Sequence, residues 1–461
     1  MAKYQKYAEY KDSGIKWLGE IPEHWIITLL KRYSFVKGGY AFSSDIFTSV
    51  GKPIIRIGDI QADGSISLEN CKYIPVAVAE NSQDYLVTKG QILMAMTGAT
   101  IGKAGIFDSD EVAYLNQRVG KFIVDSKSLN YDYLWYLLKT HGYQEYIRLT
   151  AFGGAQPNIS DTAMVDFCIS IPSIDEQIKI AKFLDHETTK IDTLIAKQEK
   201  LIELLKEKRQ AVISHAVTKG LNLNTPMKDS GVEWLGEVPE HWEVRQLRYL
   251  GSCQNGINIG AEYFGSGSSF ISYGDVYRNP ELPRVFDGLV ESTENDKRIY
   301  SVQRGDVLFT RTSETIEEIG FSSTCLTDVK DATFAGFLIR FRPIHNTLLP
   351  EYSKFYFRNI LLRAFFVKEM NLVTRASLSQ ELLKKLAVPF PSLEEQKQIA
   401  DYLSAKERVF DKLVNNCIKQ IELLKERRTA LISAAVTGKI DVRNWQNPVK
   451  NNNQDNMELS A

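Results

Sequence analysis

The chain has 461 residues, which is enough for about three domains of ordinary size. Its 56 Lys and Arg residues nearly balance its 57 Asp and Glu residues, so the formal net charge of −1 excludes a uniformly basic nucleic-acid coat but permits a basic face. Hydrophobic residues make up 44% and aromatic residues 11%, which excludes disorder in bulk and allows sizeable cores.

Cysteine and apolar patterns narrow the class of protein further. The five cysteines lie more than seventy residues apart and form no CxxC pair, so neither a zinc ribbon nor a disulfide framework is expected, and no metal ligands are predicted. No run approaches 18 apolar residues, and the first thirty residues contain no apolar signal core. We therefore expect a cytoplasmic protein with no membrane partner.

An internal repeat organises the chain. Residues 12–25 read DSGIKWLGEIPEHW and residues 229–242 read DSGVEWLGEVPEHW, so 11 of 14 positions are identical at a shift of 217. Residues 171–218 and 390–437 form a second repeated pair at a shift of 219. Because repeats reveal the building unit of a fold, the chain is predicted to consist of two half-molecules of about 218 residues each.

The repeats predict seven segments in chain order. They are an N-terminal arm at 1–25, a first body at 26–170, a long helix at 171–220, a linker with the repeated arm at 221–242, a second body at 243–389, a C-terminal long helix at 390–440 and a flexible tail at 441–461. The tail is expected to be loose because it contains six Asn among 21 residues.

The two bodies resemble each other only weakly. Both contain short β-type runs punctuated by Gly and Asp, such as PIIRIGDI at 53–60 and GDVLF at 305–309. Each body also contains one aromatic helix candidate, near 131–148 and 351–369. Each is therefore predicted to be a mixed α/β globule of about 145 residues.

The repeated endings predict long helices. No Pro or Gly occurs from Asp175 to Val217, so one helix of roughly 65 Å can form at 1.5 Å per residue. Apolar residues recur every seven positions, which is typical of a coiled-coil seam. The residues predicted for helix packing and partner docking are Leu184, Ile191, Ile195, Ile202 and Leu205 in the first copy, and Leu403, Phe410, Ile421, Leu424 and Leu431 in the second. The alternative is a helix that packs on its own body.

The obvious partner of each long helix is the other copy, and the intervening second body favours antiparallel packing. Gln198 and Cys417 occupy matching seam positions, where the polar Gln either fixes the register or is simply tolerated. The predicted fold class is α+β, with two mixed α/β domains in a pseudo-two-fold arrangement joined by two long helices that form an antiparallel coiled coil. Duplex DNA is a common ligand of that symmetry.

Catalytic signatures are missing. Residues 98–104 (GATIGKA) resemble a P-loop but have one residue too few between the glycines and lack the Ser or Thr that would hold Mg²⁺. No GxGxxG and no Asn-Pro-Pro-aromatic tetrad occurs. His24 and His241 recur beside Trp25 and Trp242, which indicates packing or capping. No catalytic residue is predicted.

Several polar side chains could read DNA. Arg pairs with guanine, Asn and Gln pair with adenine, and Gly loops and hydroxyl groups reach phosphates. The candidates are Arg56, Lys103, Asn116, Gln117, Arg118, Gln156, Asn158 and Ser160 in the first body, and Tyr273, Arg311, Thr312, Ser313, Arg375 and Ser377 in the second. For any one of them, the alternative is a turn residue or a surface ion pair.

The chain resembles the specificity subunit of type I restriction–modification systems over nearly its whole length. The resemblance rests on the duplicated arm SG[IV]xWLGE[IV]PxHW, on the helix start with Pro172, Glu176 and Gln177 and its second copy, and on the repeated ending ELLKE[KR]R. The first body adds GQILMAMTGATIGKAGI at 90–106 and GGAQPNIS at 153–160. The second body departs from this pattern, with TSETIEEIGF at 312–321 and RASLS at 375–379.

This resemblance implies that each body is a target-recognition domain for one half of a split double-stranded DNA site. It implies that the helices set the spacing and dock two methyltransferase subunits, which use S-adenosylmethionine to modify adenine. It also implies motor-nuclease subunits that use ATP and Mg²⁺, and a chain that itself holds no cofactor. The alternatives are a coiled-coil structural adaptor that does not read DNA, and an enzyme with unrecognised motifs.

Overall fold

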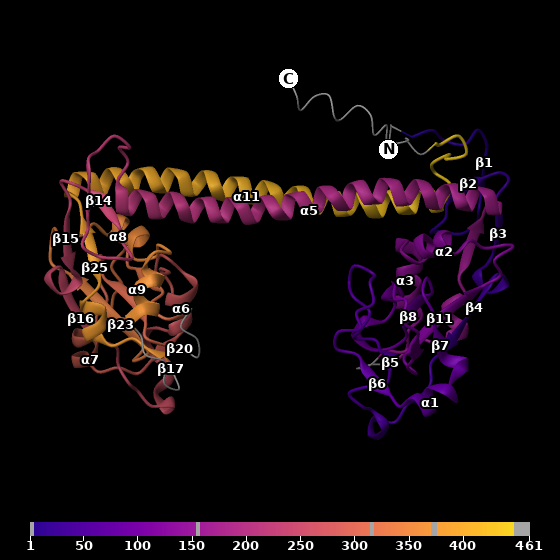
Figure 1. The fold of residues 1–461 in the computed structure, drawn as a ribbon, viewed down its shortest axis with the longest axis horizontal. Coiled ribbons are helices and arrows are strands. Elements are labelled where there is room, and N and C mark those ends of the chain that lie inside the picture. Colours follow the sequence, from indigo (N-terminus) through magenta and orange to yellow (C-terminus); the bar gives the residue numbers. More distant parts are fainter. Residues whose placement is uncertain (1–3, 154–156, 314–317, 370–375, 447–461) are drawn as a thin grey trace. The chain divides into compact units, whose positions relative to one another are not determined.

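The computed structural model describes residues 4–153, 157–313, 318–369 and 376–446 (Figure 1). The chain divides into two compact units: unit 1 comprises residues 1–197 with 420–461, and unit 2 comprises residues 198–419. Each unit combines sheets and helices around its own hydrophobic core. The division passes through both long helices, so each helix contributes one part to each unit.

Unit 1 contains two four-stranded sheets. One has the order β4-β11-β8-β9 with antiparallel neighbours, and the other has the order β6-β5-β10-β7, in which β5 and β10 are parallel. The pairs β1-β2 and β3-β12 complete the unit. The strands are β1 (Tyr10–Asp12), β2 (Glu20–Pro22), β3 (Ile26–Leu29), β4 (Ser34–Gly38), β5 (Lys52–Ile55), β6 (Lys72–Ile74), β7 (Leu86–Val87), β8 (Ile92–Ala95), β9 (Ala104–Ile106), β10 (Ala113–Leu115), β11 (Val119–Val124) and β12 (Cys168–Ile171).

The short helices of unit 1 correct one prediction. They are α1 (Val76–Glu80), α2 (Tyr131–Leu138), α3 (His141–Thr150) and α4 (Asp161–Val165). The single helix expected near 131–148 is wrong, because the helical conformation is interrupted at Lys139 and Thr140. Thr140 has an extended backbone, and its side chain accepts a hydrogen bond from the Tyr143 N–H, so it starts a new helix as an N-cap.

Unit 2 repeats this plan with differences. Its main sheet has the order β16-β23-β19-β21, a second has the order β18-β17-β22 with β17 and β22 parallel, and β13-β14, β15-β25 and β20-β24 are pairs. The strands are β13 (Met227–Asp229), β14 (Glu237–Pro239), β15 (Glu243–Gln246), β16 (Gly251–Asn255), β17 (Phe264–Ile271), β18 (Leu289–Val290), β19 (Val307–Thr310), β20 (Thr312–Ser313), β21 (Ser322–Thr324), β22 (Thr333–Phe334), β23 (Leu338–Pro343), β24 (Ala376–Ser377) and β25 (Ala387–Phe390).

The helices of unit 2 are α6 (Tyr273–Arg278), α7 (Glu294–Ile299), α8 (Pro350–Tyr356), α9 (Leu362–Glu369) and α10 (Gln380–Lys384). The single helix expected near 351–369 is also wrong. Between α8 and α9 the Asn359 side chain accepts a hydrogen bond from the Leu361 N–H and donates one to the Tyr356 carbonyl. Local bonds of this kind compete with the helical ladder and end the first helix.

The two long helices confirm the prediction from the repeated endings. They are α5 (Ile174–Lys219) and α11 (Leu393–Val436), and they pack together (Figure 1). In unit 1 the Arg428 guanidinium lies 2.9 Å from Asp192, and in unit 2 the Arg209 guanidinium lies 2.8 Å from Asp411. Both Asp residues and both Arg residues are 219 positions apart, so one ion pair is made twice. The start of α5 meets the end of α11 in unit 1, and the reverse holds in unit 2, so the helices are antiparallel.

Gln198 lies in the seam, and its side-chain oxygen has no hydrogen-bond partner among the residues that the structure describes. An unsatisfied buried oxygen costs about 1–3 kcal/mol, so Gln198→Leu is expected to raise the free energy of unfolding by about 1–2 kcal/mol. Thermal denaturation measures the gain, with Gln210→Leu on the same helix as the control. A loss of stability, or a mixture of oligomers in light scattering, would instead indicate that Gln198 fixes the register.

Glu407 joins both long helices to the body of unit 2. Its carboxylate accepts hydrogen bonds from Arg209 and, at 3.0 Å, from Lys354 of α8. Burial would raise the pKa of Glu407, but the hydrogen bonds and charges of Lys354 and Arg209 outweigh it and hold the pKa below its ordinary value.

The lowered pKa of Glu407 gives a pH dependence. The stabilisation is fully present above the unfolded-state pKa of about 4.3 and is lost as the pH falls through the lower folded-state value. Glu407→Gln is therefore expected to lower the melting temperature at pH 7 and to flatten its decrease below about pH 4.3. Exposed Glu199 provides the control, since Glu199→Gln should leave both unchanged. A wild-type acid profile in Glu407→Gln contradicts this account.

The repeated arms pack against the starts of the two long helices, one in each unit. In unit 1 the fully buried Trp25 donates its indole N–H to Glu176 at the start of α5, and the Tyr7 hydroxyl donates to the same carboxylate at 2.5 Å. His24 Nε2 lies 3.0 Å from Glu176, and His241 Nε2 lies 3.1 Å from Glu395. The two histidines therefore pack at helix starts, as their repetition predicts.

The tail begins later than expected. The prediction of a loose segment from Asp441 is wrong for residues 441–446, and residues 447–461 lie outside the described residues. Val442 is buried in the core of unit 1, Trp445 packs edge-on against Phe183 of α5, and the Asp441 N–H donates to the Gln5 carbonyl. The polar composition of the segment did not indicate this docking, because only two apolar side chains, Val442 and Trp445, hold it against unit 1.

Candidate nucleic-acid interface

Four of the predicted residues of unit 1 meet at one sheet edge. Arg56 follows β5, and Asn116, Gln117 and Arg118 follow β10. Since β5 and β10 are parallel and in register at Ile55 and Leu115, their ends deliver these side chains to the same edge. Together with Phe42, Ser44 and Phe47, the four residues line an open cavity of about 350 Å³.

Arg56 is partly held in place. Its backbone N–H donates to Asp59 at 2.8 Å, and its guanidinium donates to the Asn70 carbonyl at 3.3 Å. The buried Asp59 carboxylate lies 3.6 Å from the guanidinium; burial raises the pKa of Asp59, and the bonds and charge of Arg56 oppose that rise. Gln117 and Arg118 are exposed, so this edge offers two guanidinium groups and two amides to a ligand.

Three of the remaining candidates of unit 1 lie near the strand-like contact of Thr97 with Asn158. Asn158 is exposed, and Lys103 is half-buried in the turn after Gly102. Ser160 accepts a hydrogen bond from the Ala163 N–H as the N-cap of α4, so its hydroxyl is engaged in capping. Gln156 lies outside the described residues.

Unit 2 presents different side chains at the equivalent edge. β17 and β22 are parallel and in register at Ile271 and Phe334. Ser272 starts the following turn and donates its N–H to Asp275 at 2.8 Å, as Arg56 does to Asp59. By this correspondence Arg56 is replaced by Ser272, and Asn116, Gln117 and Arg118 by Ala335, Gly336 and Phe337.

Phe337 was missed by sequence reasoning. It is 58% exposed, and its carbonyl accepts a hydrogen bond from the Arg311 N–H at 2.9 Å. The Arg311 guanidinium donates to the neighbouring Gly336 carbonyl. Phe337 corresponds to Arg118 through the strand register alone, because the sequences around the two residues have little similarity.

The other candidates of unit 2 are placed as follows. Tyr273 stacks on Tyr277 with the ring centroids 5.9 Å apart. Thr312 and Ser313 pair with Ser377 and Ala376 in the strands β20 and β24, and Ser377 is exposed. Arg311, Thr312 and Ser377 therefore lie together, whereas Arg375 lies outside the described residues.

The predicted helix residues are occupied in packing. Leu184, Ile191, Leu403 and Leu431 are buried, whereas Ile195, Ile202, Leu205, Phe410, Ile421 and Leu424 are partly buried. The apolar side chains that a partner could reach are others. Leu194 and Leu423 in unit 1, and Leu413 and Leu204 in unit 2, are exposed by 42–54%. Each is the repeat of another at a shift of 219: Leu413 repeats Leu194, and Leu423 repeats Leu204.

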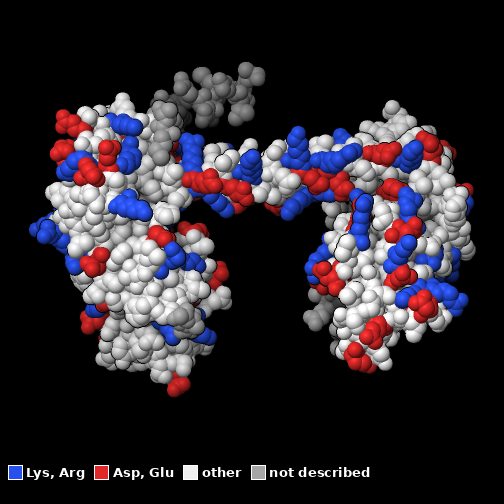
Figure 2. Space-filling view, turned by 180° about the vertical axis from the view of Figure 1, so that it is seen from behind, with Lys and Arg blue, Asp and Glu red and all other residues white. Residues whose placement is uncertain are grey.

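These four leucines are called the exposed leucine pairs below, and within each unit the two leucines share one side of the helix pair. Relative to the seam, Leu194 and Leu413 occupy g positions, and Leu204 and Leu423 occupy the adjacent c positions of the heptad. In an antiparallel pair the g positions of both helices face the same side. Lys206 and Ile213, at e positions, instead line a cavity of the unit 2 body. Figure 2 shows Lys and Arg interspersed with Asp and Glu along both helices.

Comparison with known proteins decides the family. The family described as "Type I restriction modification DNA specificity domain" matches twice, at residues 31–204 and 239–423. The chain belongs to this family. It is a specificity subunit of a type I restriction–modification system with two DNA specificity domains, and such a subunit is itself non-catalytic.

Curated specificity subunits match along their length. The EcoBI specificity subunit of Escherichia coli is 26% identical over 461 residues, covering 95% of this chain and 90% of the relative. The MjaVIII specificity subunit of Methanocaldococcus jannaschii is 23% identical and covers 94% and 98%.

Solved structures share the fold. A chain from a study of assembly and conformational transition of the type I restriction–modification system matches with a TM-score of 0.68 at 13% identity, covering 90% of this chain and 98% of that one. The HsdS subunit from Thermoanaerobacter tengcongensis matches with a TM-score of 0.54 at 14% identity, covering 91% and 98%. These matches confirm the α+β fold with two packed long helices.

The described ranges of this specificity subunit contain no group of three or more His, Cys, Asp or Glu placed to hold a metal ion. Within the same ranges, no helix has the length and apolar character needed to cross a membrane.

Proposed function

We propose that each specificity domain reads one half of a bipartite double-stranded DNA site, and that the two long helices set the spacing and dock two methyltransferase subunits. Those subunits would supply S-adenosylmethionine-dependent methylation of adenine. Motor-nuclease subunits would supply ATP- and Mg²⁺-dependent cleavage. In this division of labour the chain itself supplies recognition and assembly.

The observation that carries the reading role is the contrast at one strand edge. In unit 1 the edge presents Arg56, Asn116, Gln117 and Arg118 around a cavity, and guanidinium and amide groups are suited to guanine and adenine edges. The matching edge of unit 2 has small residues and the exposed Phe337. Two similar scaffolds with different side chains at one place support the reading of two different half-sites.

The docking role is supported by the exposed leucine pairs. The same two side chains are repeated at a shift of 219 and lie once in each unit, on one side of the helix pair. Two equivalent apolar patches are suited to two copies of one partner, since an isolated exposed Leu needs no explanation but a duplicated pair does.

The test is a map of DNA methylation. The chain is co-expressed with its methyltransferase subunit in a host without adenine methylation, and modified adenines are located by single-molecule sequencing. We expect a bipartite motif with a fixed gap, and exchange of residues 26–170 with residues 243–389 should exchange the half-sites. An assembled complex that modifies no adenine overturns the reading role and favours the structural adaptor.

Single substitutions refine this test. Arg118→Ala is expected to relax one half-site only, with discrimination at one base pair reduced by about 1–3 kcal/mol. Phe337→Ala at the matched position should alter the other half-site. Lys11→Ala, in the N-terminal arm outside residues 26–170, is the control that should leave the motif unchanged. A uniform loss of methylation with an unchanged motif would assign Arg118 to phosphate contact.

A further inference from the structure

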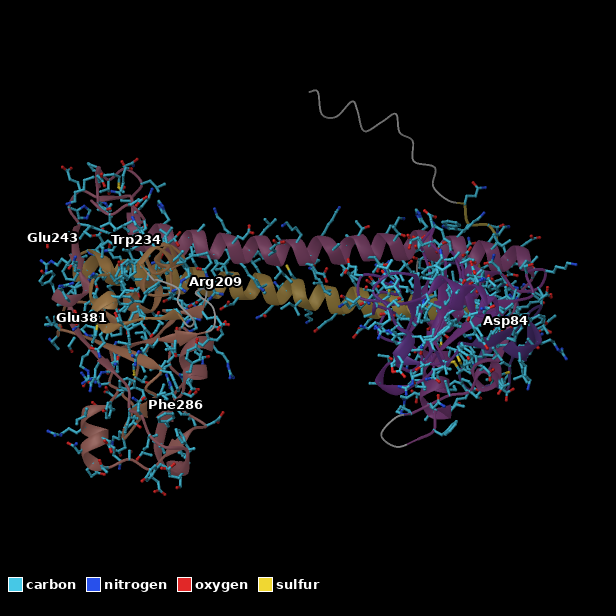
Figure 3. The ribbon with its side chains drawn as sticks, turned by 60° about the horizontal axis from the view of Figure 1, so that its bottom comes forward. Asp84, Arg209, Trp234, Glu243, Phe286 and Glu381 are labelled. Carbon is cyan, nitrogen blue, oxygen red and sulfur yellow. The ribbon has the colours of Figure 1, made fainter. Side chains whose placement is uncertain are left out.

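Unit 2 contains a cavity of about 570 Å³ that the reading of half-sites does not use. It lies between the long helices and the body, and is bounded by Lys206, Arg209 and Ile213 of α5, by Glu407 of α11 and by the segment 354–363. Arg209, labelled in Figure 3, marks its helical wall. Pockets of about 300–1,000 Å³ are the size that small ligands occupy.

The lining is strongly cationic. It contains the six cations Lys206, Arg209, Arg278, Lys354, Arg358 and Arg363, against the single carboxylate of Glu407. Arg209 and Lys354 are the two residues that pair with Glu407. Lys206 and Arg278 are exposed and form no ion pair within the described ranges, so their charges are available to a ligand. An excess of cations around a concave site attracts anions.

The remaining lining is apolar and aromatic. Phe321, Phe355, Phe357, Ile360 and Leu362 contribute to it. The guanidinium groups of Arg358 and Arg363 lie 4.6 and 5.1 Å from the centroid of the Phe321 ring. Arg358 also donates to the carbonyls of Val276, Tyr277 and Ser322, which fixes this wall. A fixed apolar wall in the same cavity as Lys206 and Arg278 suits a ligand that combines a ring with a charged group.

In unit 1 the side chains of Trp135 and Lys139 occupy the position equivalent to this cavity. At a shift of 219, Lys354 and Arg358 correspond to Trp135 and Lys139. The Lys139 ammonium lies 3.6 Å from the centroid of the Trp135 ring. The same ring is so close to Gly64 that a Cβ built there would lie 2.8 Å from it. The open cavity is therefore a property of the second specificity domain and not of the shared scaffold.

We propose that this cavity binds a nucleotide, with its phosphate on Lys206 and Arg278 and its base against the apolar wall. Charge-assisted hydrogen bonds to phosphate and contact of a base with aromatic and aliphatic side chains are the interactions that nucleotides use. The nucleotide has two possible sources, a free nucleotide and a nucleotide of the DNA strand. The site goes beyond the proposed function, because it is separate from the edge assigned to half-site reading.

The experiment compares the full chain with the double variant Lys206→Gln/Arg278→Gln. The control is Lys425→Gln, which changes the repeat of Lys206 in unit 1. Binding of adenosine diphosphate, inorganic pyrophosphate and adenosine is measured by isothermal calorimetry, and binding of cognate and unrelated duplexes is measured at several salt concentrations. Thermal denaturation establishes that each variant is folded.

A free-nucleotide site predicts that adenosine diphosphate binds with one-to-one stoichiometry, more tightly than adenosine, and at least about 10-fold more weakly to the double variant, since each charge-assisted bond contributes about 1.5–3 kcal/mol. A DNA-strand site predicts no calorimetric signal. It predicts instead weaker binding of both duplexes and a slope of log K against log salt reduced by up to about two. If neither ligand distinguishes the double variant from the control, the proposal is wrong. The methylation motif should be unchanged throughout, which separates this failure from failure of the reading role.

Discussion

A chain that carries Leu194→Asp and Leu423→Asp is expected to bind one methyltransferase subunit instead of two. These exposed side chains form the leucine pair of unit 1, and Leu413 and Leu204 form the pair of unit 2. Loss of two apolar contacts and introduction of two charges should cost about 3 kcal/mol, which is a roughly 100-fold loss of affinity. Native mass spectrometry of the co-expressed complex measures the stoichiometry.

The repeat supplies the controls for this experiment. The variant with Leu413→Asp and Leu204→Asp should lose the other subunit, and the fourfold variant should lose both. Ile418 is also exposed, but it occupies an e position, on the other side of the helix pair from the g positions, and its repeat is Glu199, so Ile418→Glu should leave the stoichiometry unchanged. Two bound subunits in the fourfold variant would remove this side of the helix pair as the docking surface.

The second large effect concerns the two arm tryptophans, which are fully buried in both units. Trp25 donates its indole N–H to Glu176 at 3.2 Å, whereas the Trp242 N–H has no hydrogen-bond partner within the described part of the chain. Trp25→Phe removes buried volume and also a hydrogen bond to a buried carboxylate. We therefore expect it to destabilise unit 1 by about 3–4 kcal/mol, against about 1–2 kcal/mol for Trp242→Phe in unit 2.

Hydrogen–deuterium exchange resolves this comparison, since peptides from the two units report local stability separately. Trp25→Phe should speed exchange in the core of unit 1, around Ile180 and Tyr133, and leave the core of unit 2 unchanged. Equal effects of the two substitutions would show that packing alone accounts for the arms. Trp25→His, which restores a donor in a smaller ring, should recover part of the difference.

The long helices could be predicted because their evidence is local. An uninterrupted run from Asp175 to Val217 and a seven-residue apolar period determine a helix and its buried side without knowledge of the rest of the chain. The helix breaks at Thr140 and Asn359 could not be predicted in this way, because apolar periodicity continues past them. A single capping side chain decided each break.

The residue types of the candidate site could be predicted from the sequence, but the position in the fold at which they meet could not. Arg56 and Asn116 are sixty positions apart, and only the parallel pairing of β5 with β10 brings them to one edge. That pairing is set by burial of Ile54, Ile55 and Leu115, which any short apolar run could have satisfied. Phe337 was not predicted, because the candidates were chosen for polar groups that can pair with bases or phosphates, and a phenylalanine has none.

The docking of residues 441–446 against the first arm has a consequence for synthesis. Unit 2 is continuous in sequence, so it can fold as soon as residue 419 has left the ribosome. Unit 1 also needs residues 420–446, and the last of these is made 249 positions after residue 197 (446 − 197 = 249). At about 5–20 residues per second this is a wait of roughly 12–50 s. During that interval the apolar face of α5 around Leu184 and Ile191 is exposed, so the first specificity domain made is the last to be completed.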